Sequence, residues 1–393
     1  MLKKNFHQTE PIPEAARAYI DDLLESGDLF RYHASVDAPV TLLEKEFAAM
    51  MGSKYALAVA SCSAALFLTL QGLELSKGAK VLIPAFTFAA VPSAVVHANC
   101  TPVLVEVNDN YRIDIEDFTA KFNDDIEAVL ISHMRGHTSD MDAIKTLCDQ
   151  KNIPLIEDAA HSLGTTWNDK KIGTIGKVGC FSFQSYKLVN GGEGGILITD
   201  DADMIARCVI MSGAYENNWQ KHDLDCNTFS KYQNELPLYN TRMSNLSAAV
   251  IRPQLNEVQR RVDNGLRNHN MLADQLNTSP YFDVPDALEP EKRAPDSIQF
   301  NLVEFSDSEA QAFMAEAHIQ GVPVSIFGLH TGNARAYWNW KFIGEMPELP
   351  KTKAMLARAC DVRLPAALTA EEVNAIGSVL LSSVENIKSG KAA

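Results

Sequence analysis

A lysine and an aspartate stand at the ends of two apolar runs, in positions where side chains could do chemistry. Lys187 follows the strand-like run GCFSF (179–183), and Asp158 closes PLIED (154–158). A desolvated lysine loses its proton readily and can attack a carbonyl carbon as a free amine. A carboxylate beside it could hold a protonated ring nitrogen, act as a base or bind a metal. Instead of these chemical roles, the lysine could be an exposed loop residue and the aspartate a helix cap, and both situations are common.

Other segments carry hydroxyl groups and an aromatic ring that could contribute to the same site. Ser61, Cys62 and Ser63 stand where the amphipathic segment SAALFLTL begins, and a helix N-terminus can bind a phosphate. Ser182 could donate a hydrogen bond to the same anion. Phe88 follows VLIPA and could stack on a flat ring. The alternatives are a plain helix cap and a phenylalanine of the core.

The glycines at 191, 192, 194 and 195 follow Lys187 and allow the backbone to approach closely. They precede the strand-like ILITDD rather than a helix, so they do not match the dinucleotide-binding fingerprint, and they contain no GK[ST] unit. A lysine, an acid, a phosphate cup and a stacking ring are together the parts of a pyridoxal 5′-phosphate (PLP) site. We therefore predict PLP as the cofactor and no metal.

Short apolar runs alternate with helical patterns between residues 40 and 210. The expected strands are VLIPA (81–85), PVLVEV (102–107), EAVLISH (127–133), PLIED (154–158), GCFSF (179–183) and GILIT (195–199). The expected helices cover 63–75, 89–97, 140–150 and 202–211. This alternation predicts an α/β fold with a mostly parallel sheet, and ligands bind at the carboxyl edge of such sheets.

A long helical pattern from Asn245 to Leu276 leads to a second region, and Pro253 is expected to break it. After a proline-rich stretch, the pattern reads strand (298–305), helix (308–320), strand (323–327) and a last helix after Thr369. We predict two domains. Residues 1–255 would form a large PLP-binding domain with an N-terminal helical segment, and residues 256–393 an interdomain helix and a small C-terminal α+β domain.

The 393 residues carry a formal net charge of −15, with a pI of about 5.1. We expect so acidic a chain to bind neither nucleic acid nor an anionic membrane, and no window holds the ~18 apolar residues of a membrane span. The seven cysteines are widely spaced without a CxxC pair, which favours free thiols in a reducing cytoplasm. The N-terminal stretch has no long apolar run, so we expect no signal peptide.

The chain resembles the DegT–DnrJ–StrS family of sugar aminotransferases, which are PLP enzymes of fold type I. The resemblance rests on ESGDLFRY, LEKEFAAMMGSKYALAVASCSAAL, IPAFTFAAVPSAV, TPVLVEV, IEDAAHSLG, GCFSFQSYKLVNGGEGG and LYNTRMSNLSAAVIRPQL. These segments span roughly residues 25 to 255 in the family's order. The resemblance implies a mixed seven-stranded sheet between helices, followed by a small α+β domain.

The resemblance also implies roles. Lys187 would form a Schiff base and move a proton at the reacting carbon, and Asp158 would keep the pyridine nitrogen protonated. The other cofactor-binding residues would be Ser61, Cys62, Ser63, the Ala64 backbone and Ser182 at the phosphate, His161 beside the cofactor, and Phe88 on its ring. Asn240 would reach the phosphate from the neighbouring subunit of a homodimer. Cys62 and Ser63 replace the family's usual Gly-Thr pair, and the serine keeps the hydroxyl.

A lysine at position 187 predicts transamination, since the dehydratases of the family carry histidine there. Glutamate, or glutamine, would be the amino donor. Arg135, His330 and Arg335 could bind an acidic acceptor, or each could form a surface ion pair. They resemble the branch that makes 8-amino-3,8-dideoxy-octulosonate (8-amino-Kdo) for lipopolysaccharide, and we predict its 8-oxo precursor as acceptor. The alternatives are a nucleotide-linked 3- or 4-keto-6-deoxyhexose and, remotely, a non-catalytic regulator.

Overall fold

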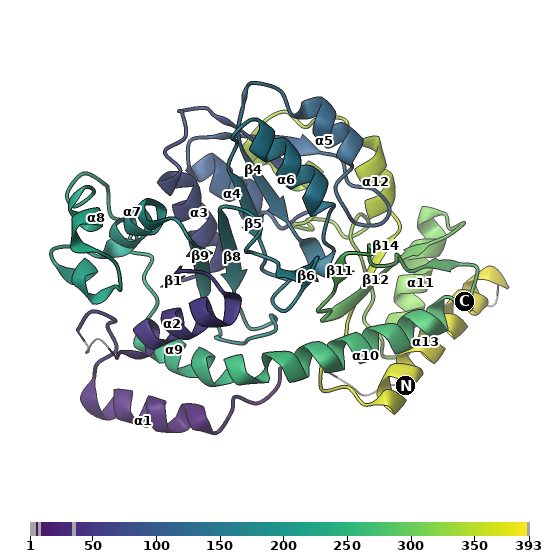
Figure 1. Cartoon of the computed structure of the whole chain (residues 1–393). Coiled ribbons are helices and arrows are strands. Elements are labelled where there is room, and N and C mark those ends of the chain that lie inside the picture. Colours follow the sequence, from purple (N-terminus) through teal and green to yellow (C-terminus); the bar gives the residue numbers. More distant parts are fainter. Residues whose placement is uncertain (1–4, 7–8, 34–36, 391–393) are drawn as a thin grey trace.

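A seven-stranded sheet forms the centre of the larger part of the molecule (Figure 1). The computed structural model describes residues 5–6, 9–33 and 37–390. The sheet has the order β1-β9-β8-β5-β4-β2-β3, in which β8 to β3 are parallel and both β9 and β1 run antiparallel to their neighbours. The strands are β1 (Tyr55–Val59), β2 (Lys80–Pro84), β3 (Thr101–Val105), β4 (Ile126–Ser132), β5 (Leu155–Asp158), β8 (Val178–Ser182) and β9 (Gly195–Thr199). All six expected strands are confirmed, and β1 is an addition.

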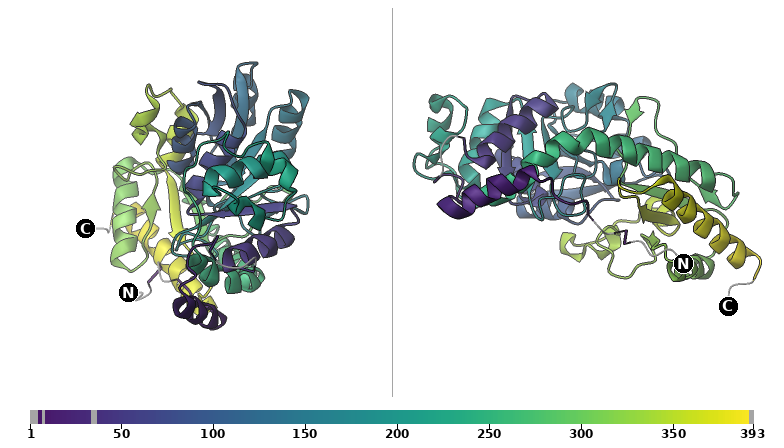
Figure 2. Two further views of the ribbon diagram at one scale, coloured as in Figure 1. Left: turned by 90° about the vertical axis from the view of Figure 1, so that its left-hand side faces the viewer. Right: turned by 90° about the horizontal axis from the view of Figure 1, so that it is seen from below.

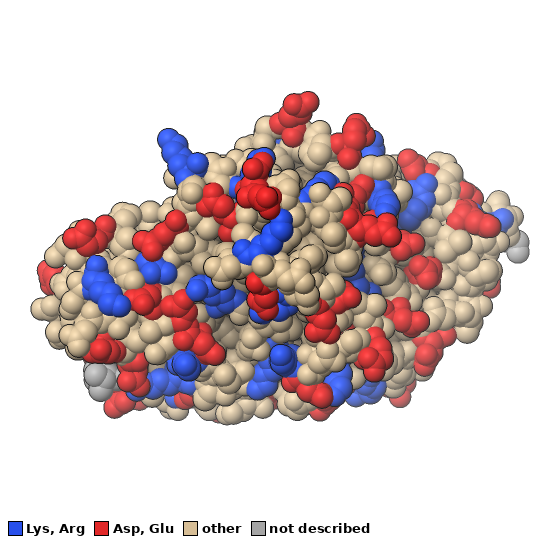
Figure 3. Space-filling view, turned by 45° about the horizontal axis from the view of Figure 1, so that its top comes forward, with Lys and Arg blue, Asp and Glu red and all other residues tan. Residues whose placement is uncertain are grey.

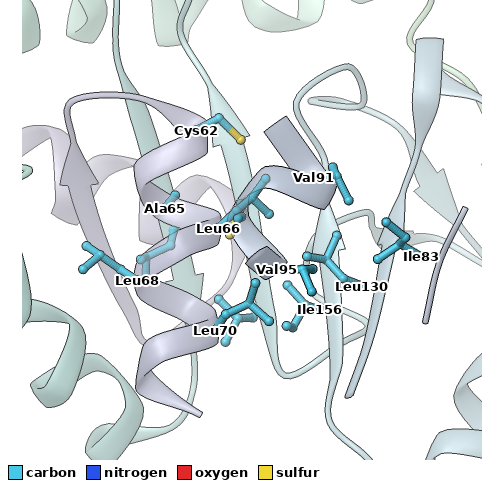
Figure 4. Packing of buried hydrophobic residues seen from close by; sticks show 14 of the residues in the cluster. Cys62, Ala65, Leu66, Leu68, Leu70, Ile83, Val91, Val95, Leu130 and Ile156 are labelled. Carbon is cyan, nitrogen blue, oxygen red and sulfur yellow. The ribbon is translucent and has the colours of Figure 1, made fainter. Parts of the chain in front are cut away.

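Helices cover both faces of this sheet, because alternate residues of each strand point to opposite sides. Ile83 belongs to one buried cluster and the adjacent Leu82 to the other. The first face packs against α3 (Cys62–Gly72), α4 (Ala90–His97) and α7 (Ala202–Gly213). Figure 4 shows Leu66 of α3 and Val95 of α4 close to Ile156 of the sheet. The second face packs against α2 (Pro39–Met51), α5 (Ile115–Lys121), α6 (Met141–Gln150) and α9 (Asn245–Ile251).

The long helical pattern that begins at Asn245 is broken at Pro253, as expected. After α9 the chain forms a 3₁₀ segment over Arg252–Glu257, and α10 (Val258–Leu276) then continues to the smaller part of the molecule. Proline lacks the N–H that an α-helix needs in its interior, which accounts for the break. Figures 1 and 2 show α10 running from beside α9 to α13, so it connects the two parts.

The smaller part is built on an antiparallel sheet of four strands in the order β10-β12-β14-β13. Its elements are β10 (Phe282–Asp283), β12 (Ser297–Leu302), α11 (Asp307–Ile319), β13 (Ser325–Ile326), β14 (Ala359–Arg363) and α13 (Ala370–Lys388). Thr369 and Glu372 form a capping box at the start of α13. The strand β14, which lies between β12 and β13, was not expected. The domain boundary at residue 255 stays a prediction.

The remaining elements lie around these two sheets. They include α1 (Ala15–Ser26), α8 (Cys226–Ser230), α12 (Pro350–Leu356) and a small sheet of β6 (Thr166–Trp167), β7 (Lys170–Lys171) and β11 (Glu291–Lys292). Acidic and basic side chains are interspersed on the face shown in Figure 3. Within the described ranges, no helix is both long and apolar enough to cross a membrane.

Candidate active site

Lys187 lies on the loop that joins β8 to β9. The Phe183 N–H donates to the Gly194 carbonyl (2.9 Å), and the Ser185 N–H donates to the Gly192 carbonyl (3.1 Å), so the loop closes on itself. Gly192 has a φ of +75°, which glycine adopts without strain. The loop brings the Lys187 Nζ to 2.7 Å from the Nε2 of His161, three residues after β5.

The lysine and histidine are both shifted toward their neutral forms. Burial lowers the pKa of Lys187 to about 8, although the nearby Asp296 acts in the opposite direction. Burial, followed by the positive charges of Lys187 and Arg135, holds the pKa of His161 well below its ordinary value. His161 is therefore neutral at pH 7, and its Nε2 can accept a hydrogen bond from the lysine. Its buried Nδ1 has no hydrogen-bond partner among the described residues.

Asp158 ends β5 and is buried, with its carboxylate held from three sides. The Ser132 hydroxyl donates to Oδ2 (2.8 Å), the Ala160 N–H donates to Oδ1 (3.1 Å), and the Cys62 thiol lies 3.8 Å from Oδ1. The register of β4 and β5 pairs Ser132 with Asp158, which places both at the carboxyl edge of the sheet. The contact with Cys62 joins this carboxylate to the start of α3.

The residues expected to bind phosphate meet at the same edge. Gly195 of β9 pairs with Ser182 of β8 on one side and with Val59, two residues before Ser61, on the other. A Cβ on Gly195 would lie 2.3 Å from the Ser61 carbonyl carbon, so only glycine leaves the necessary space. Ser61 and Ser182 therefore both lie at the point where the backbone of Gly195 meets the start of α3.

The start of α3 differs in one respect from the expectation. The helix begins at Cys62 rather than Ser63, because Ser61 is its N-cap and accepts the Ala64 N–H (3.1 Å). The Ala64 N–H therefore has a partner within the chain, whereas the Ser63 side chain is exposed. The helix-cap interpretation is correct for Ser61.

A cavity of about 520 Å³ opens beside Lys187 and His161. The three predicted substrate-binding residues, Arg135, His330 and Arg335, all line it. The structure therefore brings these three residues, which are far apart in the sequence, to the cavity that Lys187 also lines.

The arginines of this cavity differ in their partners. Arg135 Nη2 lies 2.5 Å from Asp361 Oδ2 in a buried ion pair. Arg335 forms no ion pair with a carboxylate of the described chain, and its guanidinium lies 5.9 Å from the ring centre of Phe88 and 6.0 Å from that of Phe327. Burial, then the charge of Arg135, lowers the pKa of Arg335 to about 10. Arg335 is thus the cation best able to bind an incoming anion.

Of the residues expected to bind the cofactor, His161 and Lys187 line this cavity. The others are not among its lining residues: Ser61, Cys62, Ser63, Ala64, Phe88, Asp158, Ser182 and Asn240. Phe88 is 47% exposed, and its ring centre lies 5.9 Å from the guanidinium of Arg335, which lines the cavity. Asn240 is exposed, has a φ of +54° and accepts a hydrogen bond from Arg242 Nη1 (2.7 Å). The roles of Phe88 and Asn240 stay predictions.

Sequence reasoning missed several residues around the lysine. Arg363 lines the cavity, binds Asp296 (3.0 Å) and donates to the carbonyl of Tyr186 (2.7 Å), the residue before Lys187. Arg363 and Asp361 belong to β14, and their place depends on the pairing of that strand with β12 and β13. Ser132 could have been found, since it closes an expected strand beside the one that ends at Asp158.

The arrangement fits PLP. A lysine of lowered pKa borders a cavity, a buried carboxylate lies at the sheet edge, and two serines flank the contact between Gly195 and Ser61. The unpartnered Nδ1 of His161 also leaves a buried donor for a ligand. Lys187, Asp158, His161, Ser63 and Ser182 could hold the cofactor.

Comparisons with known proteins find relatives over much of the chain. The GDP-perosamine synthase of Vibrio cholerae is 31% identical over 245 residues, which are 62% of this chain and 63% of that protein. The match thus spans less than two thirds of that relative. The spore coat polysaccharide biosynthesis protein SpsC of Bacillus subtilis is 32% identical over 274 residues, 69% of this chain and 67% of that protein.

A solved structure confirms the expected fold type I architecture. The crystal structure of 3-amino-5-hydroxybenzoic acid synthase superposes with a TM-score of 0.85 and 23% identity, covering 96% of this chain and 98% of that one. The model of the DegT/DnrJ/EryC1/StrS aminotransferase family matches residues 12–381. The prediction of PLP is confirmed as well, because this family is PLP-dependent. The chain belongs to the DegT/DnrJ/EryC1/StrS aminotransferase family.

Proposed function

We propose that this protein is an aminotransferase that moves an amino group from glutamate to a carbonyl carbon of a sugar. The observation that carries the proposal is the amine of Lys187, which has a pKa of about 8, lies 2.7 Å from a neutral His161 and borders a cavity of about 520 Å³. An amine with this pKa is partly unprotonated near neutral pH and can both attack a carbonyl and carry a proton.

We assign a separate role in cofactor binding or proton transfer to each residue of the site. Bound PLP supplies an electron-withdrawing ring that stabilises negative charge at the reacting carbon. Lys187 holds the cofactor and moves the proton at that carbon, and His161 orients the amine through its Nε2. The buried carboxylate of Asp158 holds positive charge at the ring nitrogen. Ser63 and Ser182 would bind the phosphate of the cofactor.

For the acceptor, we propose a nucleotide-linked 3- or 4-keto-6-deoxyhexose. The Vibrio cholerae relative is named for a GDP-linked sugar, which supports the alternative rather than the octulosonate preferred from the sequence. Arg135, Arg335 and Arg363 line the cavity and would attract the phosphates of such a substrate.

The 8-oxo octulosonate that leads to 8-amino-Kdo is the second candidate. The observation in its favour is the guanidinium of Arg335, which has no carboxylate partner in the described chain and could bind a substrate carboxylate bidentately. The two candidate acceptors differ in size and charge, so measuring the turnover of each one separately distinguishes them.

We also propose a homodimer in the cytoplasm. Asn240 is exposed and held by Arg242, which suits a side chain that completes the site of a second subunit. All seven cysteines belong to the described part of the chain and are free thiols, as a reducing compartment favours. Sedimentation of the purified protein would test the assembly, and a monomer would contradict it.

The acceptor is tested by converting the enzyme with glutamate and then adding each keto sugar separately. Product analysis by mass spectrometry should show the amino form of a nucleotide-linked keto sugar, and the visible absorption of the enzyme should return with the same acceptor. Turnover of the octulosonate alone would select the second candidate. Turnover of neither class would contradict the proposed acceptors while leaving the glutamate step open to its own test.

A further inference from the structure

Long polar side chains from distant elements hold the backbone on both sides of Lys187. Arg363 of β14 donates through Nη2 to the carbonyl of Tyr186 (2.7 Å). Arg261 of α10 donates through Nη1 to the carbonyl of Leu188 (2.6 Å). Each of the two residues that flank the reactive lysine is therefore bound by an arginine from outside the loop.

A third side chain extends this support along the loop. Gln254 lies in the 3₁₀ segment before α10 and is fully buried. Its Oε1 accepts the Asn190 N–H (3.1 Å), and its Nε2 donates to the Asn190 carbonyl (2.7 Å). Arg261 Nη1 also donates to this Oε1 (3.1 Å), so the two side chains form one network. Alternate loop residues, at positions 186, 188 and 190, are thus bound through their backbone groups.

Arg261 is itself fixed by an ion pair with the N-terminal segment. It is 5% exposed, and its Nε lies 3.1 Å from Glu10 Oε2. The neighbouring Arg260 also binds Glu10 (2.6 Å) but is exposed. Within the described ranges, the hydrogen bonds of Arg260 go to Glu10 and Glu257 and none reaches the lysine loop. Two adjacent arginines therefore share one carboxylate, and one of them also holds the loop.

The loop has little regular structure of its own around the lysine. Backbone hydrogen bonds close its base, whereas residues 186–190 form neither helix nor strand. The glycines at positions 191 and 192 give the backbone that follows unusual freedom. A misplacement of about 1 Å can slow a reaction about 10²-fold, even when its cause lies far from the reacting atoms. The position of the Lys187 amine therefore depends on contacts from outside the loop.

We propose that Arg261 is a positioning residue, which keeps the amine of Lys187 in place by holding the Leu188 carbonyl. The place that it maintains is the observed one, 2.7 Å from Nε2 of His161. This inference rests on the proposed function, in which Lys187 moves a proton at the reacting carbon. Arg261 is not among the described residues that line the cavity of about 520 Å³. Its loss should therefore slow proton transfer without weakening the binding of glutamate.

The test compares the full-length protein with its Arg261→Met variant, which keeps a long side chain but removes every donor. The first readout needs no cofactor: hydrogen–deuterium exchange of the peptide that covers residues 183–194 should be faster in the variant. The second is the single-turnover reaction of the PLP-loaded protein with glutamate. We expect its maximal rate to fall about 10- to 100-fold, while the half-saturating glutamate concentration changes less than about twofold.

Arg260→Met is the matched control. It removes the same charge from the adjacent position, together with an ion pair to Glu10, but leaves the contact between Arg261 and the Leu188 carbonyl. Both readouts should therefore keep their wild-type values. If Arg261→Met does not fold, Arg261→Gln serves in the same assays, since its amide stays polar but is too short to reach the loop.

The outcomes separate this inference from the function on which it rests. The inference is overturned if the exchange or the maximal rate keeps its wild-type value in a folded variant at position 261. It is also overturned if the half-saturating glutamate concentration rises instead, or if Arg260→Met loses as much. A wild-type protein that does not react with glutamate would overturn the proposed function.

Discussion

The amine of Lys187 lies 2.7 Å from Nε2 of His161, and both groups are held toward their neutral forms by burial. An ordinary lysine, with a pKa of 10.5, would be almost fully protonated at pH 7. A lysine that is partly unprotonated near neutral pH, rather than a permanent ammonium ion, therefore lies beside the cavity.

This relationship predicts the pH dependence of the site. Because the neutral amine is the reactive form, the rate of PLP capture should rise about tenfold per pH unit below pH 8 and level off above it. His161 has a pKa well below 6.5, so it should add no second midpoint above that pH. Stopped-flow absorbance would measure this profile. A midpoint near 10.5 would contradict the buried position of the lysine.

Replacing Asp158 by asparagine should separate cofactor binding from catalysis. The amide can keep the contacts with Ser132 and Ala160 but lacks the negative charge that would hold a protonated ring nitrogen. We expect PLP to bind, while the single-turnover rate with glutamate falls by about 10²- to 10³-fold.

Ser132→Ala is the matched control for that variant. It removes one hydrogen bond to the carboxylate but keeps its charge, so a loss of about tenfold or less is expected. Equal losses in the two variants would show that the orientation of Asp158, and not its charge, is what matters.

Arg335→Ala should weaken acceptor binding selectively. A hydrogen bond to a charged group contributes about 1.5–3 kcal/mol, so the KM for the keto sugar should rise roughly 10- to 100-fold. The half-reaction with glutamate should change less than about twofold. Arg17→Ala, at an exposed position of α1, is the control and should change neither step. The opposite pattern, with glutamate affected and the acceptor not, would assign Arg335 to the donor.

Gly195→Ala should disturb the contact between β9 and the start of α3. The added Cβ would lie 2.3 Å from the Ser61 carbonyl carbon, so the backbone must move, at a cost of about 1–3 kcal/mol in the free energy of unfolding. PLP binding should weaken as well, since Ser61 and Ser182 flank this point.

Gly192→Ala gives the comparison within the same loop. Its Cβ would meet open space, but its φ of +75° is unfavourable for alanine, so a cost of about 1 kcal/mol is expected from the backbone alone. Denaturant unfolding would measure both variants. If Gly195→Ala lowered the free energy of unfolding less than Gly192→Ala, the predicted clash between a Cβ at position 195 and the Ser61 backbone would be contradicted.

Much of this site could be predicted from local patterns. Lys187 and Asp158 were identifiable because each follows an apolar run that became a strand of the main sheet, and the carboxyl ends of neighbouring parallel strands meet at one edge. The break at Pro253 was predictable for a similarly local reason, the missing N–H of proline.

The remainder depends on contacts between distant segments. Arg363 and Asp296 are 67 positions apart in the sequence, and neither is marked by a motif. They meet because β12 pairs with the unpredicted β14, and Arg363 then reaches back to the lysine loop. The capping role of Ser61 was open in the sequence, since a serine before a helix can cap it or bind a ligand.

The most direct test of the aminotransferase proposal is the visible spectrum of the purified protein with PLP, recorded before and after glutamate is added. We predict a yellow absorption band that fades with glutamate and returns with a keto acid, and a Lys187→Ala variant that lacks the lysine-linked band. A folded wild-type protein that stays colourless with added PLP would contradict the account and favour a non-catalytic regulator.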